Sequence, residues 1–274
     1  MAFTATRRLV VAGALTTAAA IAAFGGFAAT AHAQSVEDIK GKGKLTVGML
    51  VDFPPFGITS ADGKPDGYDA DVAKLMAKHM GVPVEIVPVT GPNRIPYLLT
   101  GKVDVLVASL GITPERAKQV AFSDPYAAIE IGLLAPQKSP IAKAEDLSGK
   151  SAGVARASTQ DQSLTAVAPK DARIMRFDDD ASAVQALLSG QVDALGVSNV
   201  VAQQIKTMAP QANYEMKFVL KSQVQGVAMR QGQDKLLAWV NGFLDTVKKN
   251  GELTAIHQKW LGTDLPTAVT AGKS

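Results

Sequence analysis

The sequence predicts an α/β protein made of two similar lobes, each with a mostly parallel sheet. Apolar strand-like runs alternate with helix-like periodicities along most of the chain. One helix–glycine–strand unit occurs twice, and Asp193 in the second copy lies 89 residues after Asp104 in the first. A single hydrophobic core rarely serves many more residues than this chain has. Together with this limit, the repeat favours two similar lobes over a chance recurrence of a common helix–strand turn.

The first 33 residues have the order of a secretory signal. Arg7 and Arg8 precede a long run of apolar and small residues, and Ala31 and Ala33 occupy the small-residue positions of a cleavage site. The run is rich in Ala, Gly and Thr and ends in that cleavage pattern, which disfavours a membrane anchor. We expect cleavage after Ala33 and export, by the general or the twin-arginine route.

Removing these 33 of the 274 residues leaves 241, and the formal net charge falls from +3 to +1 because the segment holds two arginines and no acid. Such a balance gives no reason to expect nucleic acid or a membrane surface as a partner. The chain has no cysteine. A core of this size does not need disulfides.

The elements of the first half follow from local patterns. Strands are predicted at residues 45–49, 84–89 and 103–108, and helices at 68–80 and 95–99. Gly81 ends the longer helix. Thr113, Pro114 and Glu115 are typical of the N-cap and first turn of a further helix. The same alternation continues from residue 151 to 205.

The two copies of the repeat, residues 98–109 and 187–198, end in Ser109 and Ser198. Each copy has a helix end, a glycine suited to the left-handed position that follows it, and an apolar strand. Ligands of open α/β sheets lie beyond the carboxyl ends of the strands. We therefore expect the two serines on opposite walls of a cleft between the lobes.

Two further segments carry candidate ligand groups. Arg116 lies in the first turn of the helix that Thr113 begins, where a guanidinium suits a carboxylate, although it could equally be an exposed helix arginine. Ser158, Thr159 and Gln160 follow a predicted strand at 153–155 and offer hydroxyls and backbone N–H groups. Ser158 could also be an ordinary N-cap, and both roles are compatible.

The loop after the first strand is stiffened by Pro54 and Pro55. Phe53 either covers an apolar part of a ligand or belongs to the core, and Phe56 is predicted to be structural. Arg94 begins the short helix and is either a surface charge or a second cation for a ligand anion.

Neither a metal site nor a catalytic constellation is predicted. His79 and His257 lie on separate helices, and no Ser-His-Asp order is present. Residues 178–180 are three aspartates before a predicted helix. We interpret them as an N-cap and as negative charges that favour the positive end of the helix dipole. A calcium site is not predicted, because the ligand spacing and the central glycine of a calcium-binding loop are missing. No cofactor is expected.

Seven motifs occur in one order along the chain: GYDAD (67–71), NRIP (93–96), GKVD (101–104), TPER (113–116), FSDPY (122–126), DLSGK (146–150) and KWLG (259–262). Together they resemble the polar amino-acid family of periplasmic solute-binding proteins that serve ABC importers. The resemblance covers the whole chain after the signal.

The resemblance implies the type II periplasmic-binding-protein fold, two lobes joined by crossing strands near 130–135 and 223–228. The implied organisation is a signal peptide at 1–33, lobe 1 at 34–132 and 226–265, lobe 2 at 133–225, and a tail at 266–274. It also implies a periplasmic monomer that binds an amino acid or related carboxylate and delivers it to the membrane subunits of an ABC importer.

Roles for particular residues are also implied by the family. The arginine matching Arg116 clamps the ligand carboxylate, and the aromatic matching Phe53 stacks on the ligand. Residues matching Ser109, Gly111 and Thr159 hydrogen-bond the carboxylate and the amine. An arginine matching Arg94 binds the side-chain carboxylate in glutamate and aspartate binders. The predicted ligand-binding set is Asp52, Phe53, Arg94, Ser109, Gly111, Arg116, Ser158, Thr159, Gln160 and Ser198.

One departure from the family concerns Ser198, where many members have an aspartate that pairs with the ligand ammonium. Losing a charge-assisted hydrogen bond costs about 1.5–3 kcal/mol. Either Asp52 or Asp161 substitutes, or the ligand is not a plain α-amino acid. Arg94 and Arg116 supply two cations without an opposing acid. We therefore expect a dianionic ligand, such as an acidic amino acid or a related dicarboxylate, over a cationic one.

An enzyme is the alternative function, because cyclohexadienyl (prephenate) dehydratases resemble this fold. Such an enzyme needs a general acid with a tuned pKa in the cleft. Glu130 or Asp52 could be named, but nothing in the sequence marks either. We therefore predict a binding protein with no catalytic residues.

Overall fold

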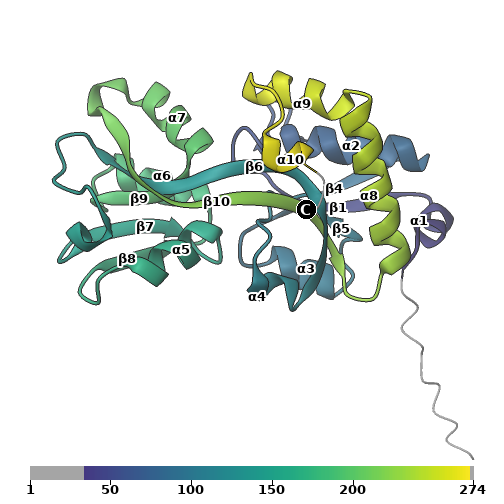
Figure 1. The fold of residues 1–274 in the computed structure, drawn as a ribbon, viewed down its shortest axis with the longest axis horizontal. Coiled ribbons are helices and arrows are strands. Elements are labelled where there is room, and N and C mark those ends of the chain that lie inside the picture. Colours follow the sequence, from purple (N-terminus) through teal and green to yellow (C-terminus); the bar gives the residue numbers. More distant parts are fainter. Residues whose placement is uncertain (1–33, 272–274) are drawn as a thin grey trace, which may run out of the picture. The chain divides into compact units, whose positions relative to one another are not determined.

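The computed structural model describes residues 34–271, and the predicted signal segment, residues 1–33, lies outside them. The described chain contains an eight-stranded sheet in the order β4-β1-β5-β10-β6-β9-β7-β8, with helices on both faces (Figure 1). Two groups of elements, called lobe 1 and lobe 2 below, lie on either side of the crossing pair β6 and β10. The two-lobed α/β fold with two crossing strands is confirmed.

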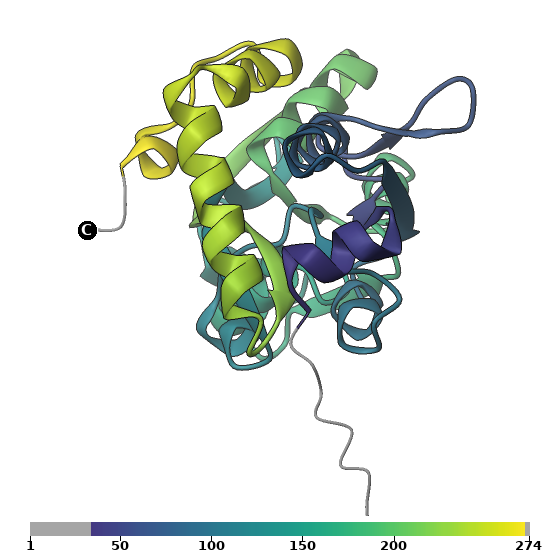
Figure 2. The same ribbon diagram turned by 90° about the vertical axis from the view of Figure 1, so that its right-hand side faces the viewer.

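Lobe 1 is built from both ends of the described chain. It contains α1 (Val36–Lys42), β1 (Leu45–Leu50), β2 (Ile58–Thr59), β3 (Pro65–Asp66), α2 (Tyr68–Met80), β4 (Val84–Val89), α3 (Arg94–Leu99), β5 (Val105–Leu106), α4 (Pro114–Ala117), α8 (Asp234–Lys249), α9 (Glu252–Leu261) and α10 (Thr267–Thr270). Helices α8 and α9 pack on each other, and α9 also packs on α2 (Figure 2).

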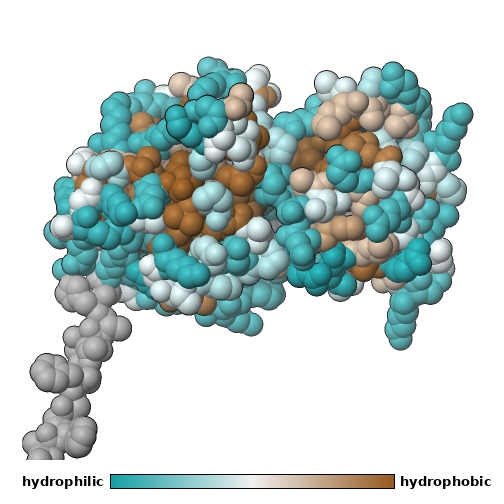
Figure 3. Space-filling model, turned by 180° about the vertical axis from the view of Figure 1, so that it is seen from behind, coloured by the Kyte–Doolittle hydropathy of each residue, from teal (hydrophilic) through white to brown (hydrophobic). Residues whose placement is uncertain are grey.

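Lobe 2 is built from the segment between the crossing strands. It contains η1 (Ala144–Leu147), β7 (Ser151–Ala155), α5 (Thr159–Val167), β8 (Arg173–Phe177), α6 (Asp180–Leu188), β9 (Ala194–Ser198), α7 (Asn199–Met208) and η2 (Pro210–Ala212). On the side of the molecule drawn in Figure 3, apolar surface gathers over each lobe.

The crossing strands are β6 (Val120–Pro136) and β10 (Tyr214–Arg230), each of 17 residues. They pair antiparallel from Tyr214↔Pro136 to Arg230↔Val120, with register shifts on both sides of Gly226. The predicted lobe boundaries, between 132 and 133 and between 225 and 226, fall inside these two strands and stay a prediction. Both strands are longer than predicted, since they also contribute to the sheet of each lobe.

The sequence repeat corresponds to a repeat in the structure. Gly101 and Gly190 have φ of 73° and 75°, the left-handed region in which glycine is least strained. Asp104 Oδ2 accepts the Thr46 backbone N–H at 2.8 Å, and Asp193 Oδ2 accepts that of Ser151 at 2.7 Å. The strands that follow, β5 and β9, pair in parallel with β1 and β7. Each lobe therefore uses the same turn to set its strand register.

Most predicted elements have the expected bounds, and the strand predicted at 103–108 is the clearest exception. Only Val105–Leu106 is a regular strand. The flanking residues still bond to β1, from Asp104 N to Thr46 O at 2.8 Å and from Val107 N to Gly48 O at 3.1 Å. The apolar residues 103–108 thus lie beside β1 as predicted, but only the central two pair with it as a regular strand.

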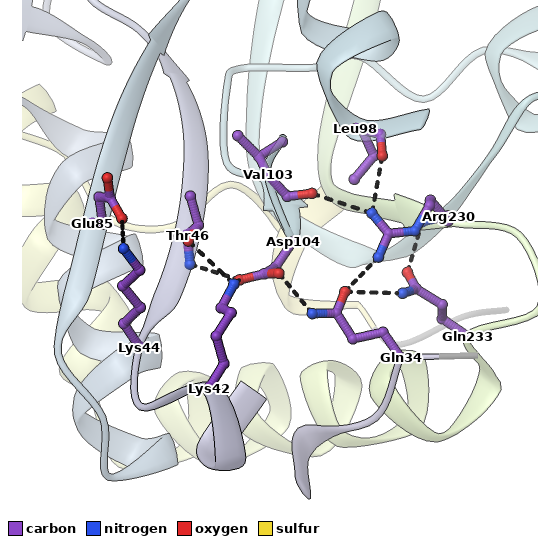
Figure 4. A network of polar contacts seen from close by, with 10 residues as sticks. All are labelled: Gln34, Lys42, Lys44, Thr46, Glu85, Leu98, Val103, Asp104, Arg230 and Gln233. Carbon is purple, nitrogen blue, oxygen red and sulfur yellow. Dashed lines mark hydrogen bonds and ion pairs between the residues drawn. The ribbon is translucent and has the colours of Figure 1, made fainter. Parts of the chain in front are cut away.

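The start of the described chain is tied to this turn by polar contacts (Figure 4). Gln34 Nε2 donates to Asp104 Oδ1 at 2.6 Å, and Lys42 forms an ion pair with the same carboxylate. Arg230, at the end of β10, donates to Gln34 Oε1 and to the Leu98 carbonyl. The network joins α1, the repeat turn and the last crossing strand. No helix within residues 34–271 is long and apolar enough to cross a membrane.

Candidate ligand-binding site

A small cavity of about 20 Å³, with room for about one water molecule, lies between the lobes. Lobe 1 contributes Leu50, Phe53, Gly91 and Arg94, lobe 2 contributes Ala155, Ser158, Gln160, Asp179 and Asp180, and the crossing strands contribute Ile129 and Gln223. Leu50, Gly91 and Ala155 lie at or just after the carboxyl ends of β1, β4 and β7. The cavity is therefore at the edge of the sheets where α/β proteins bind ligands.

Four of the predicted residues line this cavity: Phe53, Arg94, Ser158 and Gln160. Phe53 also stacks on Phe56 with ring centroids 5.8 Å apart, so it belongs to the core as well as to the cavity wall. Ser158 is the N-cap of α5, and its Oγ accepts the Asp161 backbone N–H at 3.0 Å. The capping role predicted for Ser158 is confirmed.

Arg116 contacts two other predicted residues. Its Nη1 donates to the Gly111 carbonyl at 2.9 Å and to Thr159 Oγ1 at 3.0 Å, and its Nη2 donates to the Ala157 carbonyl at 3.0 Å. The residue is 3% exposed, so it is not a surface arginine. Burial, and then the like charge of Arg94, lower the pKa of Arg116 to about 9. The side chain joins lobe 1 to lobe 2 through neutral acceptors.

Arg94 is also buried, at 5% exposure, and is not a surface charge. Its Nη1 donates to the Ala108 carbonyl at 3.0 Å, and its Nη2 lies 3.4 Å from the Ala157 carbonyl. Burial lowers the pKa of the Arg94 guanidinium, while the carboxylates of Asp180 and Asp52 act in the opposite direction. Both cleft arginines thus reach the carbonyl of Ala157, a non-glycine residue with φ of 59°.

The lobes meet closely at Gly91. A Cβ at this position would lie 2.6 Å from the carbonyl oxygen of Arg156 in lobe 2, which leaves no room for a side chain. Nearby, the Asp180 backbone N–H donates to Asp52 Oδ2 at 2.8 Å across the same gap. The structure is therefore a closed arrangement of the two lobes.

Ser109 has the positive φ of 48° and is buried. Its Oγ donates to Asp69 Oδ2 at 2.8 Å, and Tyr126 Oη donates to Asp69 Oδ1 at 2.8 Å. Burial raises the pKa of Asp69 to about 7, although both hydroxyl bonds favour the charged carboxylate. Ser109 does not line the cavity in this structure, and its contact with a ligand stays a prediction.

Ser198 is fully buried at the end of β9 and is the N-cap of α7, with Oγ accepting the Val201 backbone N–H at 3.3 Å. Like Ser109 it lies at a strand end, as predicted, but it is not among the residues that line the cavity. Its hydroxyl oxygen has a structural use, and its role in ligand binding stays a prediction.

Of the two acids considered as substitutes, only Asp52 lies at the cleft. Asp161 forms an ion pair with Arg176, 2.8 Å from Oδ1 to Nε, and lines a different pocket together with it. Asp52 accepts the Asp180 N–H and lines a neighbouring apolar pocket with Pro54 and residues of α6 and α7. Burial raises the pKa of Asp52.

Asp180 was not among the predicted ligand-binding residues. Asp179 is indeed the N-cap of α6, with Oδ1 accepting the Ser182 N–H at 2.7 Å. Asp180, however, lines the cavity and accepts from Gln160 Nε2 at 3.2 Å. Burial and the charge of Asp52 raise the pKa of Asp180 to about 7, against the lowering effect of Arg94. The available signal was its position just after β8, at the same sheet edge as Ser158.

Gln223, on β10, was also missed. It is 5% exposed, lines the cavity, and its Oε1 has no hydrogen-bond partner among residues 34–271. Its side chain packs on Gly111, where a Cβ would lie 2.4 Å from the Gln223 amide carbon. No local pattern marked it, because a strand's sequence does not tell which face borders a cavity. Across residues 34–271 there is no cluster of three His, Cys, Asp or Glu side chains that could hold a metal.

Comparison with known proteins identifies the family. The model of the bacterial extracellular solute-binding proteins, family 3, matches residues 45–263. The L-cystine-binding protein TcyJ of Escherichia coli (strain K12) is 31% identical over 83% of this chain and 86% of its own length. The ABC transporter glutamine-binding protein GlnH of Bacillus subtilis (strain 168) is 34% identical over 82% of this chain and 84% of its own length.

A solved structure with the same fold is the ancestral amino acid-binding protein AncCDT-1, described as a precursor of cyclohexadienyl dehydratase. It is 33% identical, has a TM-score of 0.74, and the match covers 82% of this chain and 98% of the other. The family match, the similarity over most of both chains and the cavity between two α/β lobes agree. The chain belongs to the bacterial extracellular solute-binding proteins, family 3, whose members include amino-acid-binding components of ABC importers.

Proposed function

We propose that this chain is the periplasmic solute-binding component of an ABC importer and binds an amino acid between its lobes, at this cavity, which widens when the lobes admit the ligand. The observation that carries the proposal is a pair of buried arginines, Arg94 in the cavity wall and Arg116 beside it, which share the Ala157 carbonyl as an acceptor. The hydrogen bonds described for both go to neutral oxygens. A carboxylate is a stronger acceptor for a guanidinium than a carbonyl or hydroxyl. The similarity to cystine- and glutamine-binding proteins supports an amino-acid ligand.

Closure is the second part of the proposal. Arg116 belongs to lobe 1, and its acceptors Thr159 and Ala157 belong to lobe 2. A ligand carboxylate that binds Arg116 and the start of α5 together favours the closed form by its differential affinity for that form. The closed form is the one that an importer's membrane subunits would receive.

The charge of the ligand follows from the whole cavity. The prediction of a dianionic ligand rested on two free arginine cations and no acid. Arg94 instead faces the carboxylates of Asp52 and Asp180, which offset its charge. We therefore favour a ligand whose single carboxylate binds Arg116, because the charge of Arg94 is already offset and does not need a second ligand carboxylate. Such a ligand is an amino acid of neutral or positive net charge rather than a dicarboxylate.

Location in the periplasm rests on the predicted signal and on the family. Gln34, the first residue after the expected cleavage site, is held by Asp104, Arg230 and Gln233. Cleavage after Ala33 would leave this network complete. A monomer is expected, since both halves of the cavity come from one chain.

The experiment is a ligand screen by thermal unfolding, with glutamine, cystine, arginine, lysine, histidine, glutamate, aspartate and simple dicarboxylates. A true ligand at 100 times its Kd adds about 2.7 kcal/mol to the free energy of unfolding. We expect such a shift with at least one amino acid. A screen in which no amino acid stabilises the protein would refute the proposal.

A dehydratase is kept as the second candidate because of one observation, the largely buried Asp180 with a pKa of about 7 at the cavity. A carboxyl group that holds a proton near neutral pH is suited to general acid catalysis. Incubation with prephenate, followed by detection of an aromatic product, distinguishes the two functions.

A further inference from the structure

We infer that the ammonium group of the ligand is received by the Gln223 amide oxygen and the Asp180 carboxylate, and not at Ser198. The inference rests on the proposed function and specifies its ligand as an α-amino acid that keeps both its carboxylate and its ammonium group. It assigns the ammonium to one crossing strand and to the start of α6.

Gln223 supplies the first acceptor. Its Oε1 lies in a side chain that is 95% buried, lines the cavity, and has no partner among the residues described. A buried carbonyl oxygen without a donor destabilises a protein, so nearly all such groups are paired. Contact with Gly111 fixes the side chain against the cavity wall. A donor that enters the cavity would satisfy this oxygen.

Asp180 supplies the second acceptor and the negative charge. Its carboxylate receives one hydrogen bond, from Gln160 at 3.2 Å, and an ionised carboxylate can accept several. Its backbone N–H donates to Asp52 across the gap between the lobes at 2.8 Å. Closure of the lobes therefore fixes Asp180 beside the cavity.

The other polar groups of the cavity also have structural uses. Ser158 Oγ and Asp179 Oδ1 cap α5 and α6, the Gln160 amide donates to Asp180, and Arg94 can only donate. The second oxygen of Asp179 adds to the acceptor capacity and the negative charge that Asp180 and Gln223 offer at this wall. An ammonium group has three donors and no acceptor, which is the complementary chemistry.

Ser198 is unsuited to the same task. It is fully buried, its hydroxyl oxygen caps α7, and it does not line the cavity. The departure of this chain at Ser198 therefore does not require a ligand without an amine.

The test compares amino acids with analogues that lack only the α-amine: L-glutamine with glutaramate, L-arginine with 5-guanidinopentanoate, and L-glutamate with glutarate. Calorimetry, with competition for weak ligands, gives the preference of the wild type for each amino acid over its analogue. We expect Asp180→Asn and Gln223→Leu each to reduce this preference by about 10- to 100-fold, mainly through weaker binding of the amino acid.

Matched controls separate this effect from damage to the fold. Asp178→Asn removes the same charge from a neighbouring side chain that is 86% exposed, and Gln225→Leu removes another buried, unpartnered amide from β10 outside the cavity. Both should keep the wild-type preference, and thermal unfolding checks that all four variants fold.

Two results would overturn the inference, and they are distinguishable. If the wild type binds amino acids but the Asp180 and Gln223 variants lose amino acid and analogue equally, or lose neither, the ammonium is held elsewhere. If the wild type binds no amino acid at all, the proposed function itself is wrong and the inference fails with it.

Discussion

At the scale of single residues, Arg116 has the sharpest expected effect. It is buried, charged and bound to neutral oxygens of both lobes. Replacing Arg116 by Ala should weaken binding of the amino acid identified in the ligand screen by about 2–5 kcal/mol, because the ligand carboxylate would be desolvated without a cation. Calorimetry measures the change.

The control for this variant is Thr159→Val, which removes one acceptor of Arg116 without changing charge. It should cost about 1 kcal/mol, the net value of one hydrogen bond. Wild-type affinity in Arg116→Ala, or an equal loss in both variants, would contradict the assignment of the carboxylate to Arg116.

The same scale shows what could not be read from the sequence. Arg116, Ser158 and Gln160 were found because they follow predicted strand ends or begin helices. Asp180 obeys the same rule, but its place beside β7 depends on the pairing of β8, which local patterns do not give. Gln223 could not be found because a strand's sequence does not tell which face borders a cavity. Ser198 was placed at the correct strand end, yet a cap hydroxyl and a ligand hydroxyl look alike in sequence.

At the scale of elements, the repeated turn is the feature that periodicity predicted best. Asp104 and Asp193 each bind the backbone N–H of the first strand in their lobe. Replacing Asp193 by Ala should lower the free energy of unfolding by about 1–3 kcal/mol, because the buried Ser151 loses its acceptor. Asp104→Ala should behave alike.

Urea unfolding measures both values, with Asp171→Ala as the control because this exposed carboxylate bonds to the exposed Ser148 side chain and not to a buried strand. That control should change stability by less than about 0.5 kcal/mol. Tolerance of both repeat aspartates to Ala would mean that the turn glycines alone set the register.

At the scale of the whole molecule, the fold was predicted well because its signals are local and repeated. Alternating strands and helices, the left-handed glycines and the caps each specify one short segment, and a second lobe reuses the first pattern. The lengths of β6 and β10 were underestimated because β10 pairs with β5 of lobe 1 and β6 pairs with β9 of lobe 2, and these pairings exist only once both lobes are assembled. Cavity contacts between lobes are non-local for the same reason.

The dependence of stability on pH is a property of the whole molecule, and Asp69 and Asp180, both with a pKa raised to about 7, act on it in the same direction. Burial raises the pKa of Asp69 to about 7, against an ordinary value of 3.8 in the unfolded chain, while Ser109, Tyr126 and Arg94 face it. Between pH 4 and 7 the folded form therefore binds more protons at this site. Stability from Asp69 should fall as pH rises through that range, by up to about 1.4 kcal/mol per pH unit.

His257 acts in the opposite direction, since burial lowers its pKa, so the wild type alone is not diagnostic. The measurement is the difference in unfolding free energy between wild type and Asp69→Asn at pH 5, 6, 7 and 8. The wild type should lose stability relative to the variant as pH rises to 7. A difference that does not change with pH would show that Asp69 titrates normally.

The path of the chain through lobe 1 has a consequence for its synthesis. Strand β5 pairs with β10 at Leu106 and Ala228, and α8 packs on β6, so the first half of lobe 1 is completed by the segment that is translated last. Lobe 2, in contrast, draws β7, β8 and β9 from one continuous stretch. Contacts close in sequence form earlier than distant ones, because loop closure costs entropy. Lobe 2 can therefore assemble first. In lobe 1 the edge of β5 stays unpaired until β10, and thus nearly the whole polypeptide, has been synthesised.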